Sequence, residues 1–331
     1  MPQSQRRADV TRQTRRRTLS VAAAIFGLAL FVYAVRRAGL AEILDGVTRV
    51  GWGLVLIIAL GGVRFLVRAQ CWRLCLPAAA QLSFRHALVA FIAGDAVGSI
   101  TPLGLLASEP TKVFLTRHHL ATRESVASLT LENLLYSASV IAMIVFGATL
   151  LLVTSPLPVP LRRGLIAGLL VVAGAVCMVP MLLRIRTVGN GLSGLPARIR
   201  WLGGIADEVR RFSLAEPGRL LQVFLLDLLY HGIAVLEVFV TLEWLMGARG
   251  PTLVMAVVFE TLNRIITVVF KFVPFRVGVD EALTGALAPL VAVDPASGVA
   301  LAVVRKVRSL FWAGIGLGAI ALHPAKPGRD T

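Results

Sequence analysis

Charged residues are scarce in this sequence, and acidic residues are the scarcest. Only 16% of the 331 residues are charged, with 18 Asp and Glu against 34 Lys and Arg, whereas about 25% is usual for a soluble domain. Hydrophobic residues reach 56% and the mean hydropathy is +0.79, above the roughly 45–50% apolar share of an average soluble domain. This balance excludes a water-soluble domain and favours an integral membrane protein.

Cysteines and soluble-enzyme motifs are also rare or missing. Cys71 and Cys75 are four residues apart, Cys177 lies in an apolar run, and no histidine or further cysteine near them completes the roughly four ligands of a zinc site. The phosphate-binding loop G-x-x-x-x-G-K-[ST], the H-E-x-x-H zinc motif and the nucleophile elbow are all missing. We therefore expect no disulfide, no metal, no cofactor and no soluble enzymatic domain.

The excess of positive charge does not indicate a nucleic-acid-binding protein. The formal net charge is +16, but a nucleic-acid reader gathers its basic residues on one solvated face. Here the basic residues separate apolar runs, as they do in cytoplasmic loops that contact anionic lipid headgroups. We expect lipids, and no nucleic acid, as partners.

Long apolar runs dominate the chain. About 20 helical residues cross the hydrocarbon layer, and a chain within lipid must satisfy its backbone hydrogen bonds internally, which requires helices. The longer runs include about 52–74, 125–153, 220–246, 251–272 and 299–322. The sequence thus predicts an all-α polytopic membrane protein with about six full spans and two proline-interrupted or re-entrant segments, at about 87–101 and 282–293.

Charge bias predicts the topology. Six arginines in residues 1–18, followed by a first apolar run at 19–35, and seven more in 184–219 predict that both segments lie in the cytoplasm. We expect a basic tail at 1–18, one transmembrane domain at 19–322 with the cytoplasmic loop 184–219, and a tail at 323–331, in a bacterial inner membrane. Segment 87–101 must then enter and leave on one side.

The two interrupted segments share a pattern, in which an apolar helix ends at proline and is followed by glycine and an acid. The matching residues are Pro102, Gly104 and Glu109, and then Pro274, Gly278 and Glu281. Interrupted segments at matching places in two halves are a sign of a transporter-type binding site. The matching segments leave open a two-fold pseudo-repeat that relates the two halves of the chain.

Charged residues within apolar runs are costly and usually functional. Arg64 and Arg68 have no acid at helical spacing, so they need a partner on another helix or a lipid phosphate. Glu260 and Arg264 are spaced i, i+4, which fits either a helix-local ion pair or a ligand site. Arginine forks suit phosphates, and carboxylates suit amines. We predict that a lipid headgroup contacts Arg64, Arg68, Glu109, Lys112, Glu132, Glu260, Arg264 and Glu281.

Three places in the sequence resemble a known family, the membrane module of lysylphosphatidylglycerol synthases and its free-standing flippase-like relatives. These places are Thr101-Pro102-Leu103-Gly104 with Glu109 and Lys112, then Leu131-Glu132-Asn133-Leu134-Leu135, and finally Phe272-Val273-Pro274 with Gly278, Glu281 and Arg305. The resemblance runs from about residue 19 to 322. Two residues depart from the family's pattern: Asn133 stands where arginine is common, and Arg276 interrupts a region of small residues.

The resemblance implies binding and translocation of an anionic or modified lipid, either aminoacylated or polyprenyl-linked, with Glu109, Glu132, Pro274 and Glu281 as functional positions. Because the sequence ends at Thr331, we expect no synthase domain and no enzymatic activity. Two alternatives remain open. One is a membrane partner that recruits a lipid-modifying synthase or glycosyltransferase through 184–219, and the other is an intramembrane lipid transferase that uses His118, His119 or Glu132.

Overall fold

The structure is a computed structural model that describes residues 40–77, 80, 82–101, 104–184, 209–247 and 250–322. The predicted N-terminal tail, the first apolar run, Pro102, most of the loop 184–219 and the C-terminal tail lie outside the described residues. Within the described part every regular element is helical, which confirms the predicted fold class. The main helices are α2 (Leu40–Val50), α3 (Gly53–Leu74), α4 (Phe84–Ile100), α5 (Leu105–Thr116), α6 (Thr122–Thr154), α7 (Val159–Arg184), α9 (Pro217–Met246), α10 (Leu253–Val269), α11 (Val279–Leu287) and α12 (Pro295–Leu322).

Helix length separates full spans from shorter elements. Among the described helices α3, α6 and α9 are long and apolar enough to cross a membrane, and α7 and α12 have 26 and 28 residues. The 17 residues of α10 extend only about 25 Å at 1.5 Å per residue, less than the roughly 30 Å hydrocarbon layer. The expected span at 251–272 is therefore a shorter helix, because the chain leaves the helical conformation after Val269.

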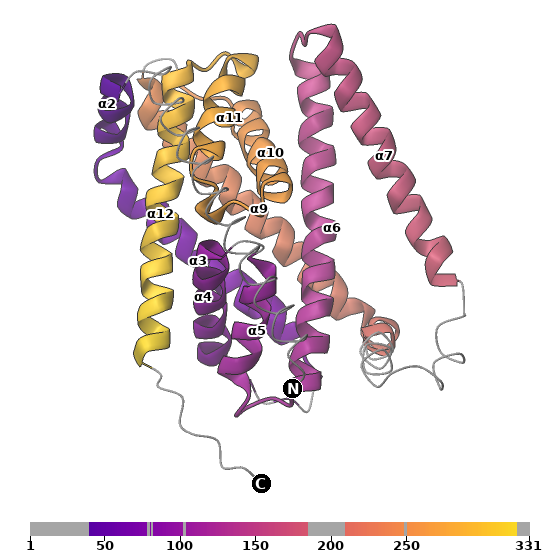
Figure 1. Cartoon of the computed structure of the whole chain (residues 1–331). Helices are drawn as coiled ribbons and strands as arrows, with labels where there is room; N and C mark the ends of the chain where they lie inside the picture. The colour runs from indigo at the N-terminus through magenta and orange to yellow at the C-terminus, as the bar shows by residue number, and fades with distance from the viewer. Residues whose placement is uncertain are drawn as a thin grey trace, which may run out of the picture.

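The short helices form two helical hairpins. Helices α4 and α5 pack against each other, as do α10 and α11. In Figure 1, α4 and α5 occupy the lower half of the molecule, and α10 and α11 occupy the upper half. The first hairpin therefore enters and leaves on one side of the molecule. The segment predicted to be re-entrant, 87–101, is only its first arm, α4, and α5 returns the chain. We call α4–α5 the first hairpin and α10–α11 the second hairpin.

The two hairpins belong to two halves with opposite orientation. Each half contains a long helix, a hairpin and another long helix, namely α3, α4–α5 and α6, and then α9, α10–α11 and α12. Helices α3 and α9 run antiparallel: Arg219 at the start of α9 donates to the Leu76 carbonyl just after α3, and Arg49 just before α3 donates to the Leu245 carbonyl near the end of α9. The sequence of elements is thus an inverted repeat, in which the hairpin tips meet near mid-depth (Figure 1).

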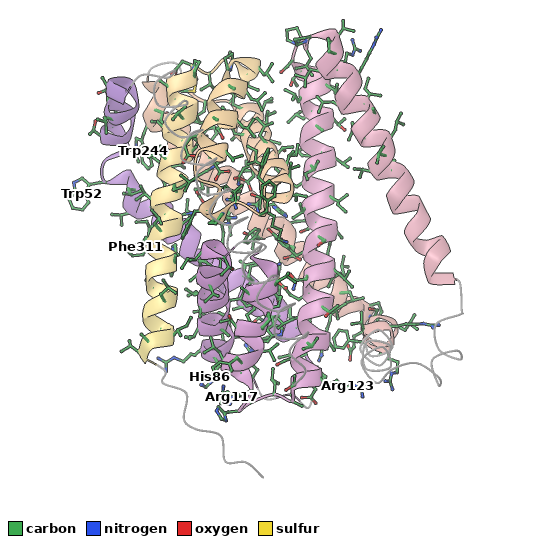
Figure 2. All side chains as sticks on the ribbon, viewed as in Figure 1. Trp52, His86, Arg117, Arg123, Trp244 and Phe311 are labelled. Atoms are coloured by element: carbon green, nitrogen blue, oxygen red, sulfur yellow. The ribbon has the colours of Figure 1, made fainter. Side chains whose placement is uncertain are left out.

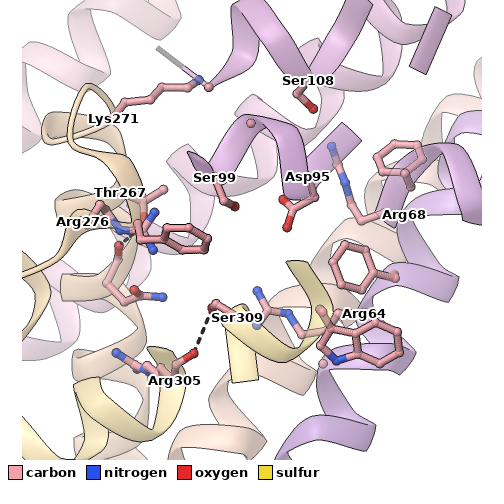
Figure 3. Close-up of a pocket in the computed structure, with 18 of the residues that line it drawn as sticks. Arg64, Arg68, Asp95, Ser99, Ser108, Thr267, Lys271, Arg276, Arg305 and Ser309 are labelled. Carbon is pink, nitrogen blue, oxygen red and sulfur yellow. Dashed lines mark hydrogen bonds between the residues drawn. The ribbon is translucent and has the colours of Figure 1, made fainter. Parts of the chain in front are cut away.

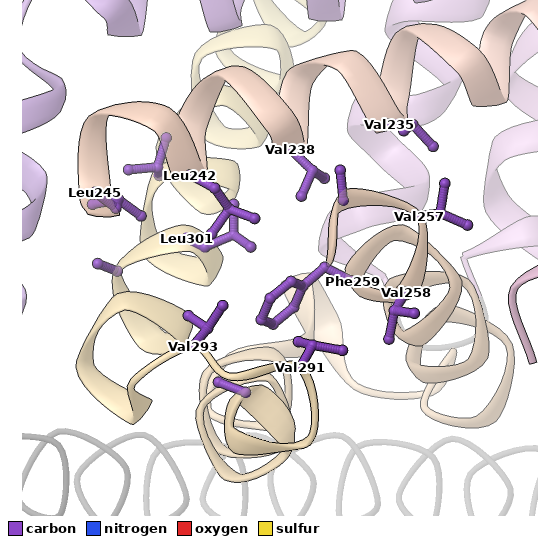
Figure 4. Close-up of a cluster of buried hydrophobic side chains, with 14 of the residues drawn as sticks. Val235, Val238, Leu242, Leu245, Val257, Val258, Phe259, Val291, Val293 and Leu301 are labelled. Atoms are coloured by element: carbon purple, nitrogen blue, oxygen red, sulfur yellow. The ribbon is translucent and has the colours of Figure 1, made fainter. Parts of the chain in front are cut away.

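Close packing and an apolar cluster hold this arrangement. A Cβ on Gly94 would meet Lys112 at 2.8 Å, and one on Gly98 would meet the Gly104 carbonyl at 3.1 Å, so these glycines let α4 and α5 approach. In the second half, Phe259 is fully buried and packs with Leu242 and Leu301 in the cluster that Figure 4 shows. Small residues at helix contacts favour dispersion packing in lipid, where helix association gains little from the hydrophobic effect.

Candidate functional site

A cavity of about 330 Å³ lies where the hairpin tips meet (Figure 3). Its walls come from both hairpins and from the long helices α3, α6, α9 and α12. The chain leaves the helical conformation before Gly104 in the first hairpin and before Pro274 and Gly278 in the second. Proline and glycine disfavour continuation of a helix, so the helices end partway through the molecule. Irregular backbone at this depth is tolerated where it lines a polar cavity.

Basic side chains dominate the wall of the cavity. Nine basic residues and three acidic residues line it: Arg64, Arg68, Lys112, Arg264, Lys271, Arg276, Arg305, Lys306 and Arg308, with Asp95, Glu109 and Asp280. Five further acids lie behind these cations and are almost completely buried: Glu132, Asp227, Glu237, Glu260 and Glu281. The buried acids neutralise much of the positive charge of the lining cations. The N–H donors of these cations remain at the cavity surface.

The arginines of α3 bind acids on other long helices. Arg64 lies 3.3 Å from Glu237 of α9, and Arg68 lies 2.8 Å from Glu132 of α6 and 3.3 Å from Asp227 of α9. The Arg68 guanidinium also stacks 3.8 Å from the centre of the Tyr136 ring. The sequence predicted either a partner on another helix or a lipid phosphate for Arg64 and Arg68. The structure shows acids on other helices.

On the opposite wall, two arginines share one carboxylate. Arg264 and Glu260 form the i, i+4 ion pair expected from their spacing, and Arg305 of α12 lies 3.7 Å from the second oxygen of Glu260. Arg264 also donates to the Tyr136 hydroxyl at 3.0 Å. Because one carboxylate serves two guanidinium groups, this wall has a surplus positive charge. The Nη2 atom of Arg305 is buried and has no hydrogen-bond partner in the described part of the chain.

The tip of the second hairpin has an unusual backbone. Phe275 and Arg276 have φ angles of +48° and +50°, a left-handed conformation that is uncommon for residues other than glycine. Lys306 of α12 donates to the Phe275 carbonyl at 2.9 Å and lies 3.0 Å from Glu281. Glu281 also accepts a hydrogen bond of 2.7 Å from the Gly278 amide. Lys306 and Glu281 thus hold the tip that presents Arg276 to the cavity.

Two cavity residues of opposite charge have no direct partner. Asp95 of α4 and Lys271, just after α10, make no hydrogen bond or ion pair with any described residue, and both side chains are exposed to the cavity. In Figure 3, Asp95 lies near Ser99 on the side of Arg68, and Lys271 lies apart from it near the second hairpin. The cavity therefore has a free carboxylate and a free ammonium group.

The structure brings the predicted headgroup residues to one place. Arg64, Arg68, Glu109, Lys112 and Arg264 line the cavity. Glu132, Glu260 and Glu281 lie behind it and pair with lining cations. Pro274 begins the turn at the tip of the second hairpin, between the lining residues Val273 and Phe275. Their binding of a headgroup stays a prediction.

Several cavity residues were not among the predicted headgroup contacts. Asp95 was recognisable as an acid in the middle of a short apolar segment, and Arg305, Lys306 and Arg308 as bases within the last apolar run. Arg276 was recognisable only as a departure from the family pattern. The aromatic residues Tyr136 and Tyr230 carry no charge, and no sequence signal marked them.

Other charged positions lie away from the cavity wall. His231 contacts Ser139 at 3.1 Å, and Asp227 contacts Arg68, so each member of this i, i+4 pair has a partner on another helix. His118 and His119 follow α5, and His119 stacks on His86 with 4.0 Å between ring centres. Figure 2 places His86 at the lower end of the molecule.

Comparison with known proteins supports this membrane assignment. The family model described as the lysylphosphatidylglycerol synthase TM region matches residues 19–318, nearly the whole chain. A search of curated proteins and a search of solved structures gave no match. The apolar helices and the family together indicate a membrane protein with a lipid-related function. The chain belongs to the lysylphosphatidylglycerol synthase transmembrane-region family.

Proposed function

We propose that the protein binds the polar headgroup of an anionic or modified lipid in the cavity and moves the lipid between the leaflets without a nucleotide. The observation that carries this proposal is a cavity with nine basic side chains between two hairpins that approach from opposite sides of an apolar molecule. A lipid phosphate would bind to arginine and lysine donors there through charge-assisted hydrogen bonds.

The membrane topology supports movement across the bilayer. A headgroup cannot cross about 30 Å of hydrocarbon without a polar path, and the cavity offers polar partners near mid-depth. The inverted repeat places one hairpin on each side of this site, so either hairpin could open the site to its own side. The protein then acts at the inner membrane of a bacterium, with its N-terminus in the cytoplasm.

The test is lipid movement in proteoliposomes that contain fluorescent phosphatidylglycerol or, in a separate preparation, fluorescent phosphatidylethanolamine, with a membrane-impermeant quencher added outside. We expect the wild-type protein to accelerate loss of inner-leaflet fluorescence. Lys271→Ala should slow this loss about tenfold, because one charge-assisted hydrogen bond contributes about 1.5–3 kcal/mol. Removal of Lys271 leaves no acid unpaired, so folding should be unaffected.

Arg163→Ala is the matched control, because Arg163 is exposed at the start of α7 and outside the cavity lining. If the wild-type protein moves no lipid, the proposal is wrong. Copurification of a lipid-modifying enzyme without lipid movement would then favour the partner alternative, and formation of a new lipid product would favour the transferase alternative.

A further inference from the structure

The cavity has a negative pole at Asp95. This carboxylate lines the cavity and is exposed within it, although its helix α4 is packed against α5 and α12. The cations that interact electrostatically with it are Lys112, Arg308, Arg276 and Arg64. A free carboxylate at this depth is costly unless a cation compensates it.

Each of these neighbouring cations already has an acidic partner. Lys112 lies 2.8 Å from Glu109. Arg64 and Arg308 both contact Glu237. Arg276 has Asp280 at 3.1 Å, from its own hairpin. Asp95 is therefore a hydrogen-bond acceptor that the protein leaves available to a ligand.

The cavity has a positive pole at Lys271 of the second hairpin. Lys271 has no acidic partner in the described part of the chain. Arg305 lies apart from it (Figure 3), and its buried Nη2 atom is the one that contacts Glu260. Thr267 and Ser309 line the same wall, and Figure 3 shows both near Arg276 or Arg305 and apart from Asp95. Hydroxyl groups beside guanidinium and ammonium groups are typical partners of phosphate oxygens.

The size of the cavity restricts the ligand further. A volume of about 330 Å³ is at the lower end of ligand pockets, which span roughly 300–1,000 Å³. It holds a small headgroup, while acyl chains stay outside. The ligand that satisfies both poles has one anionic group and one cationic group at opposite ends.

We infer that the cavity selects a zwitterionic headgroup, in which a phosphodiester binds to Lys271 and a primary ammonium group binds to Asp95. This inference rests on the proposed function and narrows its headgroup to an anionic phosphodiester that also carries an ammonium group. Asp95 is the specificity-determining residue, because phosphatidylethanolamine and phosphatidylglycerol share the phosphodiester and differ in the ammonium group.

The experiment measures binding of short-chain phosphatidylethanolamine and phosphatidylglycerol to the purified full chain in detergent, by titration calorimetry. We expect the wild-type protein to prefer phosphatidylethanolamine by about tenfold or more, the effect of about 1.4 kcal/mol from one charge-assisted contact. Asp95→Asn should remove the preference by weakening only phosphatidylethanolamine. Lys271→Ala should weaken both lipids by a similar factor, because both carry the phosphodiester.

Glu243→Gln is the matched control, since Glu243 is an exposed acid on α9 outside the cavity lining, and it should leave both affinities unchanged. Equal affinities in the wild-type protein, or a preference that survives Asp95→Asn, would overturn the inference. Binding of soluble glycerophosphoethanolamine without binding of the lipid would assign the site to a water-soluble zwitterion and also overturn it. Selective lipid binding without transport would leave the inference standing and overturn the proposed function alone.

Discussion

Arg68 shows how this protein keeps charges within an apolar molecule. Its guanidinium lies between Glu132 and Asp227 and stacks on Tyr136, so three helices meet at one cation. Removing one partner of a buried ion pair is strongly destabilising, because the other charge stays buried without compensation. Arg68 thus links α3, α6 and α9 and also lines the cavity.

Replacement of Arg68 by leucine should destabilise the folded protein by roughly 3–5 kcal/mol, because Glu132 and Asp227 would remain buried without a cation. Thermal unfolding in detergent would measure the effect. The double variant with Glu132→Gln should recover part of the loss, since it removes one of the uncompensated charges. Arg85→Leu is the control, because Arg85 is exposed at the start of α4; an equal loss there would contradict the expectation.

At the scale of the element, the tip of the second hairpin depends on α12. Two left-handed residues in succession cost roughly 1–3 kcal/mol each and persist only when surrounding contacts hold them. The contact that holds them is Lys306, whose ammonium group binds the Phe275 carbonyl and the acids at the start of α11. The position of Arg276 in the cavity is therefore set by a different helix.

We expect Lys306→Met to loosen this tip. Hydrogen exchange of the Val277 and Gly278 amides should accelerate about tenfold or more, because a hydrogen bond to a charged group contributes about 1.5–3 kcal/mol. Mass spectrometry of exchange in detergent would follow both hairpins. Exchange in α4 and α5 serves as the internal control; uniform acceleration in both hairpins would mean general unfolding and would refute a local role for Lys306.

At the scale of the whole molecule, the inverted repeat explains why two short hairpins can face each other. Antiparallel α3 and α9 start at opposite ends, so the hairpin that follows each helix enters from the opposite side. Figure 1 also shows α7 beside α6 and splayed away from the rest of the molecule. The cavity is thus a product of topology, because neither half alone encloses it.

This topology predicts the sidedness of single cysteines in a variant without the native cysteines. Ser83→Cys and His118→Cys, which flank the first hairpin, should react with an impermeant maleimide from the same side of the membrane. Ser155→Cys, after α6, should react from the other side, because α6 spans the membrane between His118 and Ser155. Labelling of Ser83→Cys and His118→Cys from opposite sides would show that the first hairpin crosses the membrane.

The sequence by itself determined the membrane class and the long helices. Apolar runs at 52–74, 125–153 and 220–246 match α3, α6 and α9 within about three residues, because a lipid-facing helix needs continuous hydrophobicity that is visible in one dimension. The i, i+4 pair of Glu260 and Arg264 was also predictable, because helical spacing makes it local.

Only the tertiary structure decided how far α10 extends, which acids bind Arg64 and Arg68, and that Asp95 has no partner among the described residues. Hydropathy continues past Val269, so it cannot show where the hairpin turns. Some ion pairs between helices join residues more than 150 positions apart, such as Arg64 and Glu237, and no local pattern encodes them. The charge of a residue is in the sequence, whereas its compensation depends on which helices the fold brings together.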